Sequence, residues 1–323
     1  MTDGPLLVTG GTGMLGRALR PLCPEAVFVS SRECDLRERR DVVKLFRDVR
    51  PSQVIHLAAR VGGVKANAEG NVELLESNAA IDTAVLGVAG EYRVERLIAV
   101  LSSCAFPLYD DRPSTESDLH AALPYRGNLG YGFAKRLLDV HVRLAARDKG
   151  LSWSTLAPVT MYGPHDRFDP ETGHVIGALF HRCRHAKLTG RPLTVWGSGE
   201  AIRQFVFVND VARLLVGMLA HEAMPDTVIV APDEGMTIRG LVEAVARAME
   251  YEGRIWYDTS QPEGVRVKRL QSERFQNTFP AFAFTKLEDG LQETARWFFS
   301  TTRQAAPPHP VAARASSNER GTC

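Results

Sequence analysis

The sequence has little net charge and no long apolar run. Its 39 lysines and arginines are balanced by 38 aspartates and glutamates, which leaves a formal charge of +1. This balance provides no basic surface for nucleic acid and no polybasic membrane anchor, although a few arginines can still bind the phosphate groups of a small ligand. No stretch reaches the roughly 20 apolar residues of a membrane span. We therefore expect neither nucleic acid nor a membrane as a partner.

Cysteine is also scarce, with five residues in a chain of 323. An odd number without regular spacing argues against a disulfide framework and a zinc site, and it is typical of a reducing compartment. The first residues, MTDGPLLVTGG, lead into an apolar strand pattern without the charged and apolar regions of a signal segment. The sequence therefore predicts a cytoplasmic protein without a bound metal.

The first half of the chain alternates short apolar runs with helical patterns. These segments read PLLVTG, MLGRALRPL, AVFVSS, RRDVVKLFRDV and QVIHLAA. The alternation is typical of βαβ units in a parallel sheet. Helical patterns over residues 72–92 and 131–148, with the strand patterns RLIAVLSS and LSWSTLAPV, continue it. The predicted fold class is α/β, with a Rossmann-type doubly wound parallel sheet.

Beyond residue 162 the pattern breaks into shorter pieces. HVIGALFHRCRHAKL and NDVARLLVGMLAH read as helices, PLTVWG and RQFVFV as strands, and residues 286–298 as a terminal amphipathic helix. We predict a dinucleotide-binding domain over residues 1–161, which also holds part of the active site. Residues 162–299 are predicted to form mainly a smaller α/β substrate-binding lobe. The composition of residues 300–323 predicts a disordered tail.

A glycine-rich turn, TGGTGMLG, follows the first predicted strand at residues 9–16. Glycine allows a tight turn and a close approach to a pyrophosphate, and the next helix offers free N–H groups at its start. Glycine-rich turns also occur for steric reasons alone, but the position after the first strand favours a dinucleotide. The contacts expected in this turn are Gly10, Thr12, Gly13, Met14, Leu15 and Gly16.

The second predicted strand ends in VSSRECDL, without the acidic residue that binds the ribose of NAD. Arg32, with Ser30 and Ser31, suits a 2′-phosphate, so the sequence favours NADP, although an exposed loop arginine without a ligand would look the same. Further cofactor contacts are expected from Asp35 and Leu36 on the adenine side, and from Leu57, Ala58, Ala59, Lys135 and Pro158.

Tyr131 and Lys135 lie four residues apart in YGFAK, on one face of a predicted helix. An ammonium near a phenol lowers its pKa and fits it for proton transfer, although such pairs also occur by chance on solvated helices. The preceding strand ends in LSSCAFP, where hydroxyls face the ligand crevice of a doubly wound sheet. We expect Ser102, with Ser103 as the alternative, to hold a substrate oxygen. Serine, tyrosine and lysine in this order indicate a short-chain dehydrogenase/reductase.

Several separate motifs resemble the GDP-L-fucose synthase family of epimerase-reductases. They are HLAARVGGVKAN at residues 56–67, LSSCAFP, MYGPHDRFDPETGHVIGAL and VWGSGEAIRQFVFVNDVA, and the likeness extends over about residues 6–219. The resemblance implies NADPH-dependent reduction of the 4-keto group of a nucleotide-linked 4-keto-6-deoxyhexose. It also implies proton transfer by Cys104 and His174, and substrate contacts from Ser103, Lys187, Trp196 and Arg203.

The implied proton chemistry is reasonable, because a 4-ketone acidifies the hydrogens on carbons 3 and 5. Cys104 acts as a base only as a thiolate, so it needs a neighbouring cation or dipole. His174 can donate a proton near neutral pH. A cysteine after a strand is otherwise often inert packing, and a histidine is often structural. Members of the superfamily commonly form homodimers through two helices, here those over residues 72–92 and 131–148.

The sequence departs from the family pattern on the substrate side. Thr160 stands where PTN would place an asparagine, Leu129 and Gly130 precede Tyr131, and VKRLQSERF replaces an RKLLD-like segment. Three functions therefore remain open. They are an epimerase-reductase with a GDP-fucose-like product, a simple 4-ketoreductase of another sugar such as a dTDP-linked one, and a non-catalytic NADPH-binding regulator.

Overall fold

A computed structural model describes residues 4–62, 71–170, 172–223, 225–232, 235–261 and 263–304. Its centre is a six-stranded sheet in the order β10-β5-β4-β3-β1-β2, with all neighbours parallel. The chain changes direction across the sheet between β1 and β3, which is where doubly wound sheets bind ligands. The predicted fold class is confirmed. The strands are β1 (Leu6–Thr9), β2 (Val27–Val29), β3 (Gln53–His56), β4 (Arg96–Val100), β5 (Ser152–Pro158) and β10 (Thr227–Val230).

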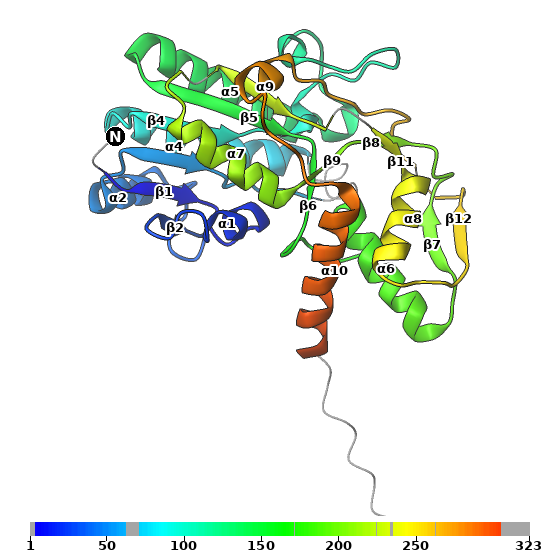
Figure 1. Ribbon diagram of the computed structural model, residues 1–323. Coiled ribbons are helices and arrows are strands. Elements are labelled where there is room, and N and C mark those ends of the chain that lie inside the picture. The colour runs from blue at the N-terminus through cyan, green and yellow to red at the C-terminus, as the bar shows by residue number, and fades with distance from the viewer. Residues whose placement is uncertain are drawn as a thin grey trace, which may run out of the picture.

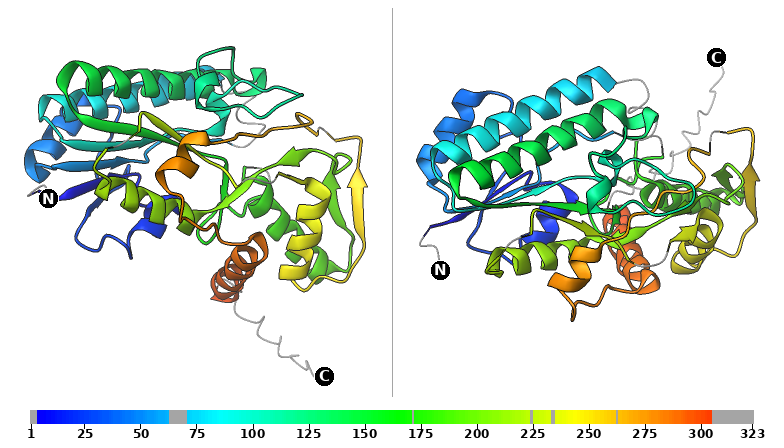
Figure 2. Two further views of the ribbon diagram at one scale, coloured as in Figure 1. Left: turned by 45° about the horizontal axis from the view of Figure 1, so that its top comes forward. Right: turned by 90° about the horizontal axis from the view of Figure 1, so that it is seen from above.

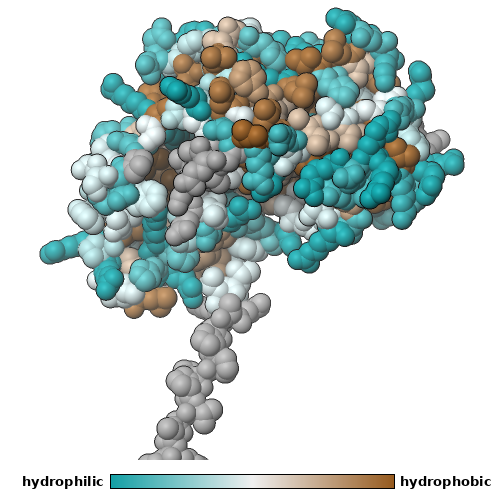
Figure 3. Space-filling view, turned by 180° about the vertical axis from the view of Figure 1, so that it is seen from behind, coloured by the Kyte–Doolittle hydropathy of each residue, from teal (hydrophilic) through white to brown (hydrophobic). Residues whose placement is uncertain are grey.

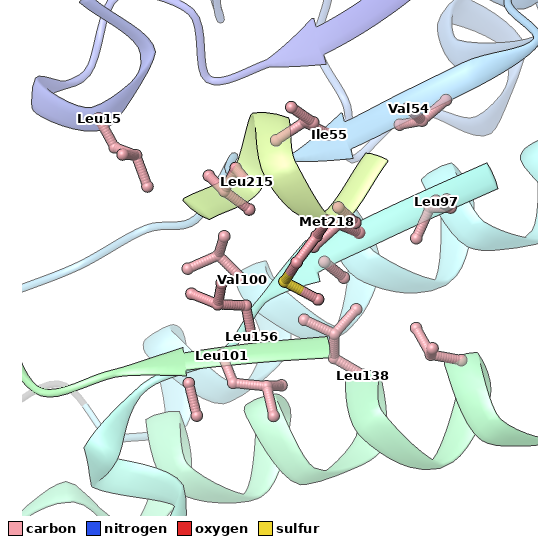
Figure 4. Close-up of a cluster of buried hydrophobic side chains, with 14 of the residues drawn as sticks. Leu15, Val54, Ile55, Leu97, Val100, Leu101, Leu138, Leu156, Leu215 and Met218 are labelled. Carbon is pink, nitrogen blue, oxygen red and sulfur yellow. The ribbon is translucent and has the colours of Figure 1, made fainter. Parts of the chain in front are cut away.

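Helices cover both faces of this sheet (Figures 1 and 2). One face carries α2 (Arg39–Val49), α4 (Asn71–Glu91) and α5 (Leu129–Lys149), and the other carries α1 (Met14–Leu19) and α7 (Val208–Ala220). In Figure 4, Leu138 of α5 lies on the lower side of β5, and Leu215 and Met218 of α7 lie near Ile55 and Val100 of the sheet. Since both faces are covered, the strands are apolar along nearly their whole length, as the sequence pattern indicated.

A second, smaller core lies beside the sheet. It is built on α6 (Val175–Thr189), α8 (Ile238–Ala248) and α10 (Leu287–Gln304). Three two-stranded sheets complete this lobe and join it to the first core. They pair β6 (Thr160–Tyr162) with β9 (Phe205–Phe207), β7 (Leu193–Trp196) with β12 (Ile255–Asp258), and β8 (Ile202–Arg203) with β11 (Met236–Thr237).

Several segments that follow residue 161 pack in the first core. Helix α7 and strand β10 belong to the first core, as does Phe275 of α9 (Glu273–Thr278). Helix α7 packs on the sheet through Val211, Leu214, Leu215 and Met218, which recur at the spacing of one helical face. Strand β9 serves both cores, because Val206 points into the first while its neighbours Phe205 and Phe207 point into the second.

Helix α10 is longer than predicted. It continues through Gln304, so the first five residues of the expected disordered tail, 300–304, are helical. Leu291, Ala295 and Phe298 anchor the helix in the second core, and the hydroxyls of Thr301 and Thr302 donate hydrogen bonds to helix carbonyls. The rest of the expected tail lies outside the described residues. None of the described helices is long and apolar enough to cross a membrane.

Candidate active site

The glycine-rich turn lies at the end of β1, in the crevice between β1 and β3. Gly10 has a φ of 73°, and a Cβ there would lie 2.9 Å from the backbone nitrogen of Ala58. A Cβ on Gly16 would lie 2.6 Å from the carbonyl oxygen of Gly10, so α1 can approach the turn only without a side chain. Gly13 precedes the helix, whose first N–H groups have no helical partner. This backbone fits a pyrophosphate.

The residues after β2 are partly engaged with one another. The hydroxyl and N–H of Ser30 both donate to Glu33 Oε2, at 2.7 Å, so Ser30 is not the free phosphate ligand that the sequence suggested. The Asp35 carboxylate accepts three hydrogen bonds from Arg37, two from its guanidinium and one from its backbone N–H, which hold the pKa of Asp35 at about 2. Leu36 is buried in the first core. Arg32 is exposed, and among the described residues its guanidinium has no hydrogen-bond or ion-pair partner.

The other predicted cofactor contacts lie at the carboxyl edge of the sheet. Leu57 and Ala58 follow β3, and their N–H groups donate to the carbonyl and hydroxyl oxygens of Thr9. Ala59 is the next residue, and Pro158 ends β5, where it pairs with Val230. These positions therefore border the crevice in which the glycine-rich turn lies.

Tyr131 lies near the start of α5, beneath the loop that follows β4. Its side chain is buried, and Lys135 Nζ lies 6.0 Å from the centre of its ring. Burial raises the pKa of Tyr131, the negative charges of Cys104 and Asp82 add to this, and the side chain of Ser102 opposes it. The pKa of Tyr131 is therefore above its ordinary value although an ammonium lies nearby. The Lys135 ammonium lies 3.7 Å from an Asp82 carboxylate oxygen, which offsets its charge.

Cys104 lies two residues after Ser102, in the short 3₁₀ helix η1 (Ser103–Ala105). Its Sγ accepts hydrogen bonds from Lys268 Nζ at 3.3 Å and from Asn128 Nδ2 at 3.2 Å. Burial by itself raises the pKa of the thiol, but the charge of Lys268 and hydrogen bonds from Ser102, Lys268 and Asn128 outweigh it. The pKa of Cys104 is therefore below its ordinary value, which favours the thiolate.

Lys268 and Asn128 were not found from the sequence. Lys268 lies in the segment VKRLQSERF, at the place where the family pattern is lost, and no local spacing marks it as part of a site. Its N–H donates to the carbonyl of Ile202 at 3.1 Å, and Gln204 exchanges two hydrogen bonds with the backbone of Leu270. These bonds fix the segment, so the ammonium is held beside the thiol.

A small pocket adjoins this thiol and contains two of the predicted substrate residues. Ser103 contributes to its wall from the first core, and Arg203 contributes from β8. The guanidinium of Arg203 donates to the carbonyls of Ile202 and Val265, at 2.7 and 2.6 Å. The remaining lining residues are Val159, Thr160, Gln204, Lys268 and Leu270.

His174 is the N-cap residue of α6 and has a partly exposed side chain. Its Nδ1 lies 3.7 Å from Oδ1 of Asp166, a buried carboxylate. The other Asp166 oxygen has no hydrogen bond among the described residues. An imidazole beside a carboxylate is well placed to carry a proton.

Comparison with known proteins agrees with this geometry. Residues 6–231 match the model of the NAD dependent epimerase/dehydratase family. The chain belongs to this family. It is 32% identical to GDP-L-fucose synthase of Dictyostelium discoideum, with 93% of this chain and 97% of the relative aligned. It is 33% identical to the probable GDP-L-fucose synthase of Drosophila melanogaster, over 93% and 98%.

A solved structure of similar sequence is the GDP-L-fucose synthetase from Naegleria fowleri bound to NADP. It superposes with a TM-score of 0.87 at 32% identity, over 94% of this chain and 95% of that one. The resemblance inferred from the sequence motifs is thus confirmed at the level of the family.

Lys187, another predicted substrate residue, does not line the pocket next to Cys104. The ammonium of Lys187 donates to the carbonyl of Met249 at 2.7 Å, beside a surface pocket that Arg191 and Tyr251 also line. The cation beside Trp196 is instead Arg182, whose Cζ lies 4.4 Å above the centre of the indole ring. Both cations are on α6, and the sequence alone gave no reason to prefer Arg182.

Proposed function

We propose that the protein reduces the 4-keto group of a GDP-linked 4-keto-6-deoxyhexose, after epimerisation at carbons 3 and 5. One observation carries the proposal. The thiol of Cys104 lies between two donors, Lys268 and Asn128, in the same short segment as Ser102, whose side chain acts on the pKa of Tyr131. A base for carbon-bound protons and an acid for a ketone oxygen are therefore close together.

The reduction needs a proton donor at the ketone oxygen. NADPH bound along the glycine-rich turn supplies the hydride that reaches carbon 4. Tyr131 donates its proton to the oxygen as negative charge develops there, and its raised pKa keeps the phenol protonated until then. Ser102 holds the same oxygen, and Lys135 supports the cofactor ribose. Arg32 contacts the 2′-phosphate.

The epimerisation needs a base and an acid on opposite faces of the sugar. Cys104 removes a proton next to the ketone, because Lys268 stabilises the thiolate and the ketone stabilises the resulting anion. His174 returns a proton from the other face, and its Nδ1 lies 3.7 Å from the Asp166 carboxylate.

The nucleotide part of the substrate needs an aromatic surface and cations. Arg182 and Trp196 provide them in the second lobe, and Arg203 lies in the pocket next to Cys104. The names of the relatives support guanosine as the base. A binding comparison of GDP with dTDP tests this choice, and tighter binding of dTDP would contradict it.

Deuterium incorporation tests the proposed reaction. The protein is incubated with GDP-4-keto-6-deoxymannose and NADPH in deuterium oxide, and carbon-bound deuterium in the product is measured by mass spectrometry. We expect label at carbons 3 and 5, and we expect Cys104→Ser to lose it. Cys23→Ser, at a half-buried cysteine outside the site, serves as the matched control.

Two other results would change the assignment. Turnover that leaves no carbon-bound label in the product and is unaffected by Cys104→Ser would assign a simple 4-ketoreductase. One observation favours this function: Thr160 lines the pocket at the position where the family pattern has asparagine. NADPH binding without turnover of any 4-keto-6-deoxy sugar would leave a regulator.

We also propose that the protein is a homodimer. Helix α5 exposes Phe133, Leu137, Val140 and Leu144, which recur along one helical face. Val72 and Leu75 extend this apolar face from the neighbouring α4. Figure 3 shows hydrophobic patches on the upper rear of the molecule, where these helices lie. A second copy that packs the same two helices against this face would bury it.

A further inference from the structure

A buried polar chain lies behind Lys135 and has no part in the proposed reaction. Thr9 Oγ1 lies 2.7 Å from His56 Nδ1, and His56 Nε2 lies 3.0 Å from Asp82 Oδ1. The other oxygen of Asp82 lies 3.7 Å from Lys135 Nζ. All four side chains are almost completely shielded from solvent.

These four side chains lie at the edge of the sheet where the ligand crevice is. Thr9 ends β1 and His56 ends β3, the two strands between which the chain changes direction, and Asp82 reaches them from α4. A charge this deep in a protein costs several kcal/mol unless it is compensated. His56 binds one oxygen of Asp82, whereas Oδ2 has no hydrogen bond among the described residues and has Lys135 as its nearby cation.

We propose that Asp82 is a positioning residue that determines how much net positive charge acts on the phenol of Tyr131. Its carboxylate offsets the Lys135 ammonium, so the phenol stays protonated and remains a proton donor at neutral and alkaline pH. This inference rests on the proposed keto reduction for its purpose, but not for its test.

The charged groups around Tyr131 come from several elements. Cys104 faces it from η1 and Asp82 from α4, while Lys135 lies one turn further along α5, and both anionic groups raise the pKa of Tyr131. Lys268 lies on the far side of Cys104. Removing the charge of Asp82 leaves Lys135 uncompensated, so the pKa of Tyr131 should fall.

Asp82 itself faces three further titratable groups. They are His56 of β3 and Lys135 and His141 of α5. Burial and Lys149 lower the pKa of His141, and Asp82 opposes this. His141 is therefore mainly neutral near pH 7, and Lys135 remains the principal cation whose field Asp82 offsets.

The substitution Asp82→Asn tests the proposal, because it removes the charge and keeps an oxygen for His56. The phenolate absorbance of the full-length protein is titrated with pH in the wild type and in Asp82→Asn. Subtracting the same titration of each protein with Tyr131→Phe isolates Tyr131 from the other six tyrosines. We expect Asp82→Asn to lower the midpoint of Tyr131 by about one pH unit or more. The alkaline limit of NADPH oxidation should fall with it, because reduction needs the protonated phenol.

Two further variants complete the experiment. Asp139→Asn removes a fully buried carboxylate of α5 that binds His120, Arg143 and two threonines, and it should leave the Tyr131 midpoint unchanged. His56→Gln removes the imidazole that binds the Asp82 carboxylate, and it should lower the Tyr131 midpoint by less than Asp82→Asn does. This variant provides a test if Asp82→Asn does not fold. An unchanged midpoint in both site variants would overturn the inference. A shifted midpoint in a protein that reduces no 4-keto sugar would support the inference about Asp82 and contradict the proposed function.

Discussion

The ammonium of Lys268 lies 3.3 Å from the sulfur of Cys104, although 164 residues separate them in the sequence. The thiol belongs to the loop after β4, in the first core. The ammonium belongs to a segment that crosses from the second lobe and is fixed there by Ile202 and Gln204. The acidity of the thiol therefore depends on the correct assembly of both lobes.

Replacing Lys268 should make Cys104 less reactive. In Lys268→Met the thiol loses its cation, its pKa rises, and its thiolate fraction near pH 7 falls by about tenfold for each unit of the rise. The alkylation rate with iodoacetamide as a function of pH measures this, with Cys104→Ser to identify the signal. Lys268→Arg keeps the charge and should retain most of the reactivity. Equal rates in wild type and Lys268→Met would show that the lysine does not activate the thiol.

Removing the phenol hydroxyl should separate the two proposed half-reactions. Tyr131→Phe deletes the proton donor, and we expect keto reduction to slow by about 10²-fold or more. Deuterium exchange at carbons 3 and 5 should persist, since it depends on Cys104 and His174. NADPH oxidation and product mass, measured on the same samples, distinguish these outcomes. Near-normal reduction would assign the proton donor to another group.

Two glycines in the paired helices α4 and α5 should respond in opposite ways to alanine. A Cβ on Gly130 would overlap the carbonyl oxygen of Asn71, so Gly130→Ala should lower the free energy of unfolding by about 1–3 kcal/mol. A Cβ on Gly87 would meet nothing within 4 Å, and Gly87→Ala should be neutral or stabilising by up to about 1 kcal/mol. Urea denaturation of both variants provides the measurement, and equal effects would argue against the close approach at Gly130.

Arg32 should determine the choice between the two nicotinamide cofactors. Arg32→Ala removes a charge-assisted contact to the 2′-phosphate, worth about 1.5–3 kcal/mol, so kcat/KM with NADPH should fall by roughly 10- to 100-fold. The value with NADH should hardly change. Arg37→Ala is the control, because Arg37 is already paired with Asp35. A wild type that prefers NADH would contradict the assignment.

The proposed dimer should dissociate when its apolar face is charged. Leu137→Glu with Val140→Glu places two carboxylates at the centre of the exposed stripe on α5, where a partner would have to bury them. Light scattering after size-exclusion chromatography should then change from the mass of a dimer to that of a monomer. A single change at Leu188, exposed on α6, should leave the mass unaltered. A monomeric wild type would disprove the dimer.

The parts of the fold that the sequence predicted correctly are those with strong local periodicity. Strands β1 to β5 are short apolar runs, and α4 and α5 follow long helical patterns, so each could be recognised from its own residues. The place of α7 in the first core could not be predicted in the same way. Its helical pattern is clear from the sequence, but only the packed sheet decides which core receives it.

The same distinction applies to the site. Tyr131 and Lys135 are four residues apart on one helix, and Ser102 and Cys104 share one loop, so chemistry and spacing were sufficient to propose them. Asp82 and Lys268 contact the site only through tertiary packing, and nothing in their local sequence predicts it. Arg182 was not found from the sequence because it shares α6 with Lys187, and only the position of Trp196 distinguishes the two.

Helix α7 and strand β10 join the first core although they come late in the sequence, and this order has a consequence during synthesis of the protein. When a ribosome has released β1 to β5, the edge of β5 that later pairs with β10 is still open, and the sheet face that α7 covers is still bare. Open edges and bare apolar faces attract other chains. The sheet of the nascent chain therefore stays open to other chains until α7 and β10 have been synthesised.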